Sequence, residues 1–184
     1  TVGSGVYEVI KKNQVSINKK VGQELKVQYV LDLREFPGDP VMDVLTHDFE
    51  DILNDDEVKI VAEVMGGLHP AYEFTRRCLE AGKSVCTSNK ELVAEHGAEL
   101  IQIAKDHQVN YLFEASVGGG IPIIRPLNSS LTADVIVEIS GILNGTTNYM
   151  LTKMSREGLN YDDVLKEAQA KGYAELHPEA DVEG

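Results

Sequence analysis

The hydrophobic positions along the chain follow two periodicities that alternate. Apolar residues recur at helical spacing in some segments, and short runs rich in β-branched and aromatic residues, typical of strands, lie between them. We predict helices within four ranges: 1–13, 49–57, 69–83 and 90–107. We predict strands within four others: 24–34, 58–67, 84–90 and 109–114. Residues 35–43, "EFPGDPVMD", have the composition of a loop.

This alternation indicates an α/β fold with a Rossmann-type parallel sheet. The strands are almost continuously apolar, which favours a parallel sheet with helices on both faces. The longest predicted helix, 90–107, carries one apolar stripe made of Leu92, Val93, Leu100, Ile103 and Ala104. We expect that stripe to face the sheet.

The pattern changes after about residue 120. A short helix is expected within 122–131, a longer strand within 134–143 and two helices within 144–158 and 161–172, before a polar, acidic tail. We therefore place a domain boundary at Gly118–Gly120. Residues 1–118 would form a first domain of α/β type, and 119–184 would begin a second, α+β domain.

Composition excludes several classes of function. The chain has 17 Lys and Arg against 30 Asp and Glu, so its net charge of -13 provides no basic surface for nucleic acid or an anionic membrane. The two cysteines form no CxxC, and no apolar run approaches the ~20 residues of a membrane span. Because no basic region followed by an apolar run opens the sequence, we expect no signal peptide. The five histidines lack HxH or HExxH spacing, so zinc is not expected. We expect a cytoplasmic protein.

Candidate cofactor residues lie where ligands of a doubly wound sheet bind, beyond the strands' carboxyl ends. Thr1, Val2 and Gly3 lead into a helix, and Gly3 would be the last glycine of a GxGxxG turn whose helix receives a pyrophosphate. A plain helix start is the alternative. Asp32 suits the ribose hydroxyls of NAD and Arg34 the 2'-phosphate of NADP, so the cofactor stays open between the two; either residue can instead be a solvated strand end.

Two further segments follow predicted strands. Gly66 and Gly67 permit close approach of the backbone to a ligand, although a simple tight turn explains them equally. Ser88, Asn89 and Lys90 bring two hydrogen-bonding side chains and a cation to the same edge. The alternative for Lys90 is a solvated surface charge.

The stretches "VMGGLHPAYEFTRRCLEAGKSVCTSNKELVAEHGAEL", "FEASVGGGIPII", "GILNGTTNYML" and "AQAKGYAELHPEADVEG" occur in an order and at separations that resemble homoserine dehydrogenase. The resemblance covers essentially the whole chain, and it is specific because several motifs match together. It implies NADPH- or NADH-dependent reduction of L-aspartate 4-semialdehyde to L-homoserine, in threonine and methionine biosynthesis. It also implies a homodimer with a nucleotide-binding domain and a dimerisation and catalytic domain.

The resemblance assigns roles to matching positions. Lys90 matches a lysine between nicotinamide and substrate, and Glu175 in "GYAE" matches the glutamate that binds the substrate amino group. Gly172 would allow the ligands to approach closely. Without the resemblance, Glu175 would be interpreted as a solvated acid of the tail. The implied mechanism is hydride transfer to the aldehyde carbon, with a protein cation stabilising the developing alkoxide and a general acid supplying its proton.

The segment "EASVGGGI" resembles the family's binding loop for a monovalent cation, usually sodium. The matching positions are Glu114, Val117, Gly119 and Ile121, which would offer one carboxylate and backbone carbonyls. A hard cation prefers oxygen ligands, and glycine lets the backbone turn its carbonyls inward. An interdomain hinge is the alternative interpretation, and the two are compatible.

The family has a strand and two fingerprint glycines ahead of the first matching position, and an Asp and a Lys of the catalytic machinery after the last. We therefore expect this chain to be a fragment whose own activity is doubtful. The alternative function is a non-catalytic nucleotide-binding or dimer-forming part of that enzyme.

Overall fold

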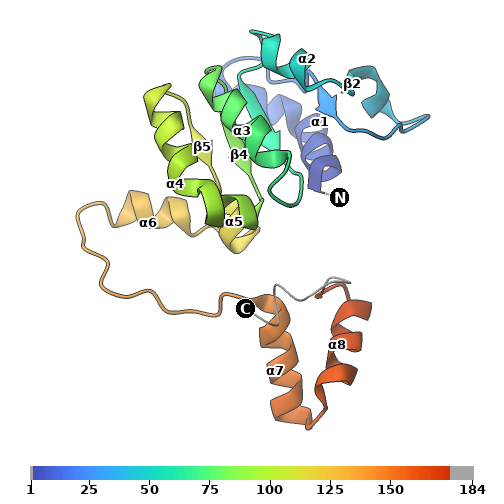
Figure 1. Cartoon of the computed structure of the whole chain (residues 1–184), viewed down its shortest axis with the longest axis vertical. Helices are drawn as coiled ribbons and strands as arrows, with labels where there is room; N and C mark the ends of the chain where they lie inside the picture. The colour runs from blue at the N-terminus through green and yellow to red at the C-terminus, as the bar shows by residue number, and fades with distance from the viewer. Residues whose placement is uncertain (1, 175–184) are drawn as a thin grey trace. The chain divides into compact units, whose positions relative to one another are not determined.

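The computed structural model describes residues 2–174, which form eight α-helices, one 3-10 helix and five short strands (Figure 1). The α-helices are α1 Val2–Val21, α2 Phe49–Asn54, α3 Ala71–Glu80, α4 Lys90–Asp106, α5 Glu114–Gly118, α6 Ile124–Ser130, α7 Gly145–Glu157 and α8 Tyr161–Ala170. The strands are β1 Val30–Leu31, β2 Leu45–Thr46, β3 Ile60–Glu63, β4 Ser84–Thr87 and β5 Tyr111–Leu112, and the 3-10 helix is η1 Pro40–Val44. No helix within 2–174 has both the length and the apolar character needed to cross a membrane.

All strand pairs are parallel. β1 pairs with β2, and a second sheet has the order β3-β4-β5. In that sheet Glu63 lies opposite Thr87, and Val85 lies opposite Tyr111. Each parallel pair is connected through a helical segment, as parallel geometry requires. The predicted α/β fold with a Rossmann-type parallel sheet is confirmed.

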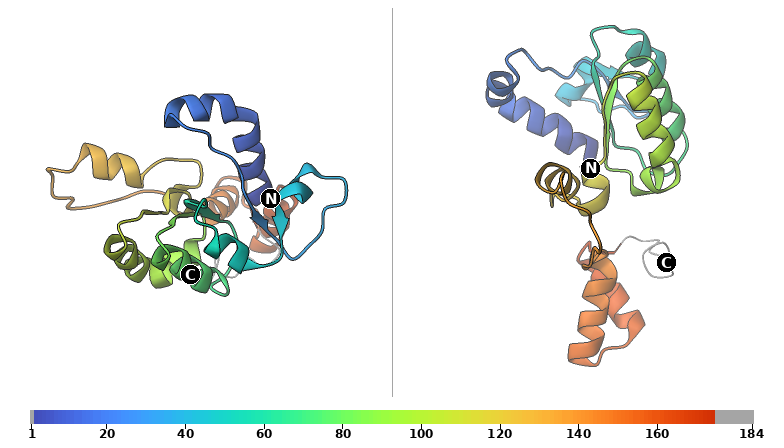
Figure 2. Two further views of the ribbon diagram at one scale, coloured as in Figure 1. Left: turned by 90° about the horizontal axis from the view of Figure 1, so that it is seen from above. Right: turned by 90° about the vertical axis from the view of Figure 1, so that its left-hand side faces the viewer.

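The two faces of the three-stranded sheet differ in burial. Val85 and Tyr111 point to the face that α3 and α4 cover, and they are only 1% and 6% exposed. Figure 2 shows α1 on the opposite side of the sheets from α3 and α4. None of the residues of α1 is buried, however, and Ile60 and Leu112 on that side are 60% and 49% exposed. The expected covering by helices is therefore tight on one face and loose on the other.

The core of the first unit lies between α3, α4 and the sheet. Leu79, Leu92 and Leu100 are fully buried there. Each such leucine contributes roughly 1.5–3 kcal/mol through removal of its side chain from water. The apolar stripe predicted on α4 is confirmed: three of its members are buried, and Val93 and Ile103 pack against the cluster.

The chain divides into two compact units, residues 1–132 and 133–184. In the second unit α7 and α8 pack through Met150, Val164 and Ala168, which are at most 2% exposed. The side chain of Asn144 caps α7 and that of Asn160 caps α8, and each accepts a bond from a backbone N–H of the first turn. The domain boundary expected at Gly118–Gly120 stays a prediction.

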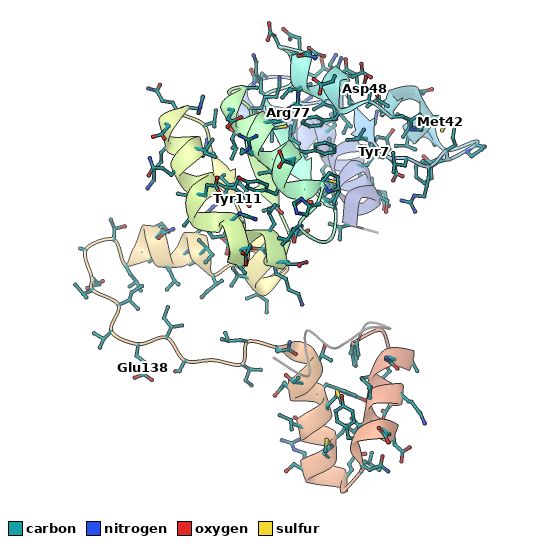
Figure 3. The ribbon with its side chains drawn as sticks, in the orientation of Figure 1. Tyr7, Met42, Asp48, Arg77, Tyr111 and Glu138 are labelled. Carbon is teal, nitrogen blue, oxygen red and sulfur yellow. The ribbon has the colours of Figure 1, made fainter. Side chains whose placement is uncertain are left out.

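The strand expected within 134–143 was wrong. This segment has no regular secondary structure, and Glu138, labelled in Figure 3, lies within it. A strand needs a neighbour for its backbone groups, and no segment within the described residues pairs with this one. Its apolar side chains are largely exposed, with Val135 at 87% and Val137 at 94%.

Two other differences concern the first sheet. The strand expected within 24–34 is regular only at Val30–Leu31, and β2 at Leu45–Thr46 was not predicted. A two-residue strand is too short to show a period-2 pattern in the sequence. It forms through pairing with a segment that lies farther along the chain, which the local pattern does not reveal.

Candidate functional site

The carboxyl ends of β3, β4 and β5 lie at one edge of the three-stranded sheet. Because the strands are parallel and Glu63 lies opposite Thr87, the loops that follow them leave at the same edge. Three segments predicted from the sequence belong to these loops: Gly66–Gly67, Ser88–Lys90 and the stretch that begins at Glu114. Ligands of open α/β sheets bind at such an edge.

Asn89 joins the loops after β3 and β4. Its side-chain amide donates a hydrogen bond of 2.7 Å to the carbonyl oxygen of Gly67. Its side-chain oxygen accepts a 3.0 Å bond from the N–H of Leu92 and so caps α4, whose first residue is Lys90. Gly67 has a φ of 74°, a conformation that favours glycine. Two candidate residues, Gly67 and Lys90, are thus held by one buried asparagine.

A buried carboxylate lies beneath these loops. Glu63, the last residue of β3, is only 4% exposed. Its side chain accepts a 2.6 Å hydrogen bond from the N–H of Met65 and a second bond from the hydroxyl of Thr87. Burial raises the pKa of Glu63, whereas the hydrogen bonds from Thr87, Met65 and Asn89 oppose that effect.

Glu63 was not among the site residues predicted from the sequence. Its only signal was an acidic residue within a predicted, mainly apolar strand that runs directly into Gly66 and Gly67. A single acid at a strand end is usually solvated, so this signal was not distinctive.

The amino-terminal turn of α1 comes close to the segment that follows β3. A Cβ atom placed on Gly3 would lie 3.1 Å from the Cγ2 atom of Val64, so the Val64 side chain would have to shift by a few tenths of an ångström to admit a larger residue. Gly3 and its neighbour Val2 therefore lie near the loop that contains Gly67. Thr1, the third residue of this predicted group, lies outside the described residues.

Asp32 and Arg34 form a close pair just beyond β1. The guanidinium donates two hydrogen bonds, of 3.0 and 2.8 Å, to the carboxylate, and the backbone N–H of Arg34 adds a third of 2.9 Å. These bonds lower the pKa of Asp32 to about 2. The Arg34 side chain remains 74% exposed, so its cation stays accessible from solvent.

Glu114, the first residue of α5, caps the next helix. Its Oε1 atom accepts hydrogen bonds from the backbone N–H groups of Ile123 and Ile124, the latter 2.8 Å long. Its Oε2 atom accepts one of 2.8 Å from Arg125. These backbone bonds lower the pKa of Glu114. A carboxylate oxygen has two lone pairs, so Oε2 retains capacity for one further partner.

The other predicted cation ligands follow Glu114 in a tight loop. Gly119 has a φ of 59°, and the N–H of Ile121 closes a turn on the carbonyl of Gly118 at 3.0 Å. Within residues 2–174 no hydrogen-bond donor reaches the carbonyl oxygens of Val117, Gly119 or Ile121. The loop thus offers oxygen atoms of the kind that a hard cation prefers.

In the second unit, Gly172 follows α8 with a φ of 73°. The loop around it is fixed by the hydroxyl of Thr146, which donates a 2.7 Å bond to the carbonyl of Tyr173. The Tyr173 ring also meets the Tyr149 ring edge-on, with centroids 5.0 Å apart. Glu175, the predicted substrate ligand, lies outside the described residues.

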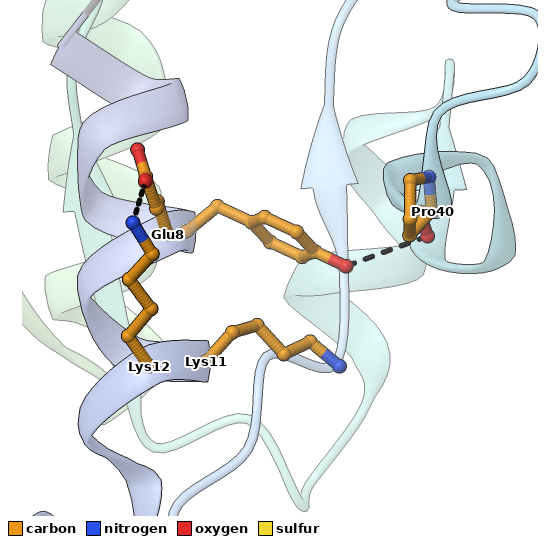
Figure 4. Close-up of a pocket in the computed structure, with 5 residues that line it drawn as sticks. Glu8, Lys11, Lys12 and Pro40 are labelled. Carbon is orange, nitrogen blue, oxygen red and sulfur yellow. Dashed lines mark hydrogen bonds and ion pairs between the residues drawn. The ribbon is translucent and has the colours of Figure 1, made fainter.

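A shallow hollow of about 380 Å³ lies between α1 and η1 (Figure 4). Tyr7 lines it, and its hydroxyl donates a 3.4 Å bond to the carbonyl of Pro40. Lys12, another lining residue, is paired with Glu8. None of the predicted site residues lines this hollow.

Two family models match the chain. The model "Homoserine dehydrogenase, NAD binding domain" matches residues 1–114, and the model "Homoserine dehydrogenase" matches residues 122–184. Among curated proteins, homoserine dehydrogenase of Bacillus subtilis is 43% identical over the whole chain, and that of Synechocystis is 44% identical over the whole chain. The chain spans 43% of the length of each of these two relatives.

The solved structures that match this chain are also homoserine dehydrogenases. The crystal structure of a homoserine dehydrogenase from Thiobacillus denitrificans matches with a TM-score of 0.87 and 40% identity, over 98% of this chain and 42% of that one. A hyperthermophilic archaeal homoserine dehydrogenase in complex with NADPH matches with a TM-score of 0.70 and 29% identity, over 91% of this chain and 48% of that one.

Proposed function

The chain belongs to the homoserine dehydrogenase family, and from this we propose that its protein reduces L-aspartate 4-semialdehyde to L-homoserine with NADPH or NADH. One observation carries the proposal. At the carboxyl edge of the sheet, the Asn89 side chain donates a hydrogen bond to Gly67 and also caps α4, the helix that begins at Lys90. We place the protein in the cytoplasm, in threonine and methionine biosynthesis. Family membership supports both assignments.

The cofactor would bind along this edge, where the residues present suit it. The amino terminus of α1, a helix of 20 residues, offers backbone N–H groups and a favourable dipole to a pyrophosphate. Gly3 lies in tight contact with the Val64 side chain, so a glycine fits best beside that helix end. Gly67 likewise presents bare backbone, which allows a flat nicotinamide ring to approach. Thr1 and Val2 are proposed as further contacts at that helix end, and the family resemblance adds Gly172 of the second unit as a proposed cofactor contact.

Lys90 is the proposed catalytic residue. When bound, the cofactor supplies a hydride to the aldehyde carbon. The ammonium group of Lys90, at the exposed start of α4, would stabilise the negative charge that develops on the aldehyde oxygen. Glu175 would bind the substrate's amino group, because a carboxylate is the natural partner of an ammonium ion.

The pair Asp32 and Arg34 would decide which cofactor is preferred. An arginine binds a phosphate through two parallel hydrogen bonds, the geometry that Arg34 now uses with Asp32. NADP binding would therefore exchange one anionic partner of Arg34 for another. NAD, without the 2'-phosphate, would rely on Asp32 for its ribose hydroxyls.

A sodium ion would occupy the loop of Glu114, Val117, Gly119 and Ile121. The three carbonyls and the remaining lone pair of Glu114 Oε2 supply oxygen ligands, while the carboxylate provides the negative charge. Because Glu114 also caps α6, the ion would tie α5 and α6 to one another.

We also propose a homodimer. The segment 134–143 combines β-branched residues with unusual exposure, illustrated by Val135 and Val137. Such a segment is stabilised when its backbone pairs with another strand and its apolar side chains are covered. A second copy of the protein would supply that surface.

Lys90→Ala in the full-length protein should lower kcat for aspartate semialdehyde roughly 100-fold or more, because loss of one charge-stabilising donor typically has that effect. Glu175→Gln should mainly raise KM for the same substrate. Both are measured by NADPH and NADH oxidation. Lys105→Ala, at the other end of α4, is the matched control and should retain full activity. Equal activity of the Lys90 and Lys105 variants would contradict the catalytic role.

Arg34→Ala should weaken NADPH binding by roughly tenfold or more, the value of a charge-assisted hydrogen bond, and leave NADH binding nearly unchanged. Asp32→Asn should shift preference in the opposite direction. Cofactor titrations followed by fluorescence measure both. Arg76→Ala on α3 serves as the control. A parallel loss for both cofactors in the Arg34 variant would show that it contacts no 2'-phosphate.

Glu114→Gln should raise the sodium concentration needed for half-maximal activity by roughly tenfold, since it removes the only formal charge among the proposed ligands. The assay replaces sodium chloride with choline chloride at constant ionic strength. Glu95→Gln, an exposed acid on α4, should respond as the unchanged protein does. If the unchanged protein and both variants show the same activity with and without sodium, the loop binds no functional cation and serves only as a hinge.

Val137→Lys should weaken the dimer by roughly tenfold or more, because an unpaired ammonium is costly to bury. Sedimentation velocity of the full-length protein over a concentration series measures this. Val15→Lys, at an equally exposed valine of α1, should leave the association unchanged. A monomer at all concentrations, or equal effects of both variants, would overturn the proposed dimer.

A further inference from the structure

We propose that Glu63 is a positioning residue that holds the loops after β3 and β4 in register, and thereby sets the places of Gly67 and Lys90 relative to one another. The inference rests on the proposed function, because it gives those two residues their roles. Glu63 itself is buried beneath the edge and belongs to none of the groups proposed to contact cofactor or substrate.

The Glu63 carboxylate forms hydrogen bonds to two different segments. Oε1 accepts a 2.6 Å bond from the N–H of Met65, one residue before the glycine pair. Oε2 accepts the hydroxyl proton of Thr87, the last residue of β4 and the register partner of Glu63. One carboxylate therefore restrains the start of one loop and the end of the neighbouring strand.

Thr87 and Asn89 connect Glu63 to the proposed site. The hydroxyl oxygen of Thr87 accepts a 2.9 Å bond from the N–H of Asn89. Asn89 in turn donates to Gly67 at 2.7 Å and caps α4 through Leu92. A continuous series of hydrogen bonds thus runs from Glu63 through Thr87 and Asn89 to both loops.

This arrangement buries a carboxylate, which costs free energy. No Lys, Arg or His among the described residues pairs with Glu63 to compensate. The Tyr111 hydroxyl on the same buried face has no hydrogen-bond partner within residues 2–174. Burial raises the pKa of Tyr111, and the Glu63 charge raises it further. An apolar residue would suit a purely structural position better. A carboxylate provides two acceptors at once, which is the property that joining two loops requires.

The test compares four variants of the full-length protein. Glu63→Gln keeps one acceptor for Met65 and can donate to Thr87, so its kcat should stay within roughly threefold of normal. Glu63→Leu and Thr87→Val break the series and should each lower kcat roughly 100-fold, the effect that small misplacements of catalytic groups produce. Thr75→Val is the matched control, because Thr75 is equally buried and its hydroxyl has no partner within residues 2–174.

Three measurements separate positioning from general destabilisation. Thermal unfolding reports stability, and hydrogen–deuterium exchange of segments 64–67 and 87–92 reports the two loops directly. The double variant Glu63→Leu, Thr87→Val should lose no more kcat than either single variant, because both remove the same connection. Faster exchange in both loops together with this non-additive loss supports the proposal.

The proposal is overturned if Glu63→Leu resembles Thr75→Val in kcat and in loop exchange, or if Glu63→Gln loses as much kcat as Glu63→Leu. Failure of the proposed function is seen separately, as absence of aspartate semialdehyde reduction by the unchanged protein. In that case the exchange data still decide whether Glu63 holds the two loops.

Discussion

The parallel pairing of β3 with β4 is the constraint on which the rest of the site depends. Parallel strands in register deliver their following loops to one edge, so Glu63 opposite Thr87 places Gly67 beside Asn89. The helices α3 and α4 cover the buried face of this sheet and fix its position. The proposed cofactor contacts Gly67 and Lys90 are arranged around that edge.

Polar side chains cap the helices that follow this sheet. The side chains of Asn89 and Glu114 accept hydrogen bonds from backbone N–H groups that the first turns of α4 and α6 would otherwise leave free. In the second unit Asn144 begins α7, and Thr146 in its first turn holds the loop that contains Gly172. Lys90 and Gly172, two of the residues proposed to meet ligands, therefore lie next to helix ends or loops that polar side chains fix.

Glu114 illustrates how one residue serves two interpretations. Its carboxylate caps a helix in this structure, while the family resemblance assigns it to a cation. The proposed ion would use a lone pair that the cap leaves free, so the two roles are compatible. Asp32 and Arg34 present a similar case, because they pair with one another in this structure and each is proposed to contact a different cofactor.

The fold class, the long helices and most candidate site segments were predictable from the sequence, because helical periodicity, apolar strands and glycine pairs are local signals. The stripe on α4 and the loops at Gly67 and Lys90 are examples. Glu63 was not predictable, since its role depends on burial and on Thr87, a residue 24 positions away. Nor was the absence of a strand within 134–143, where the local pattern is present but no described segment pairs with it. The sequence by itself determined most of the helices and the residues that follow β3, β4 and β5, whereas only the tertiary structure decided which segments pair and which of those residues meet, because pairing across the sheet joins segments that the local pattern cannot relate.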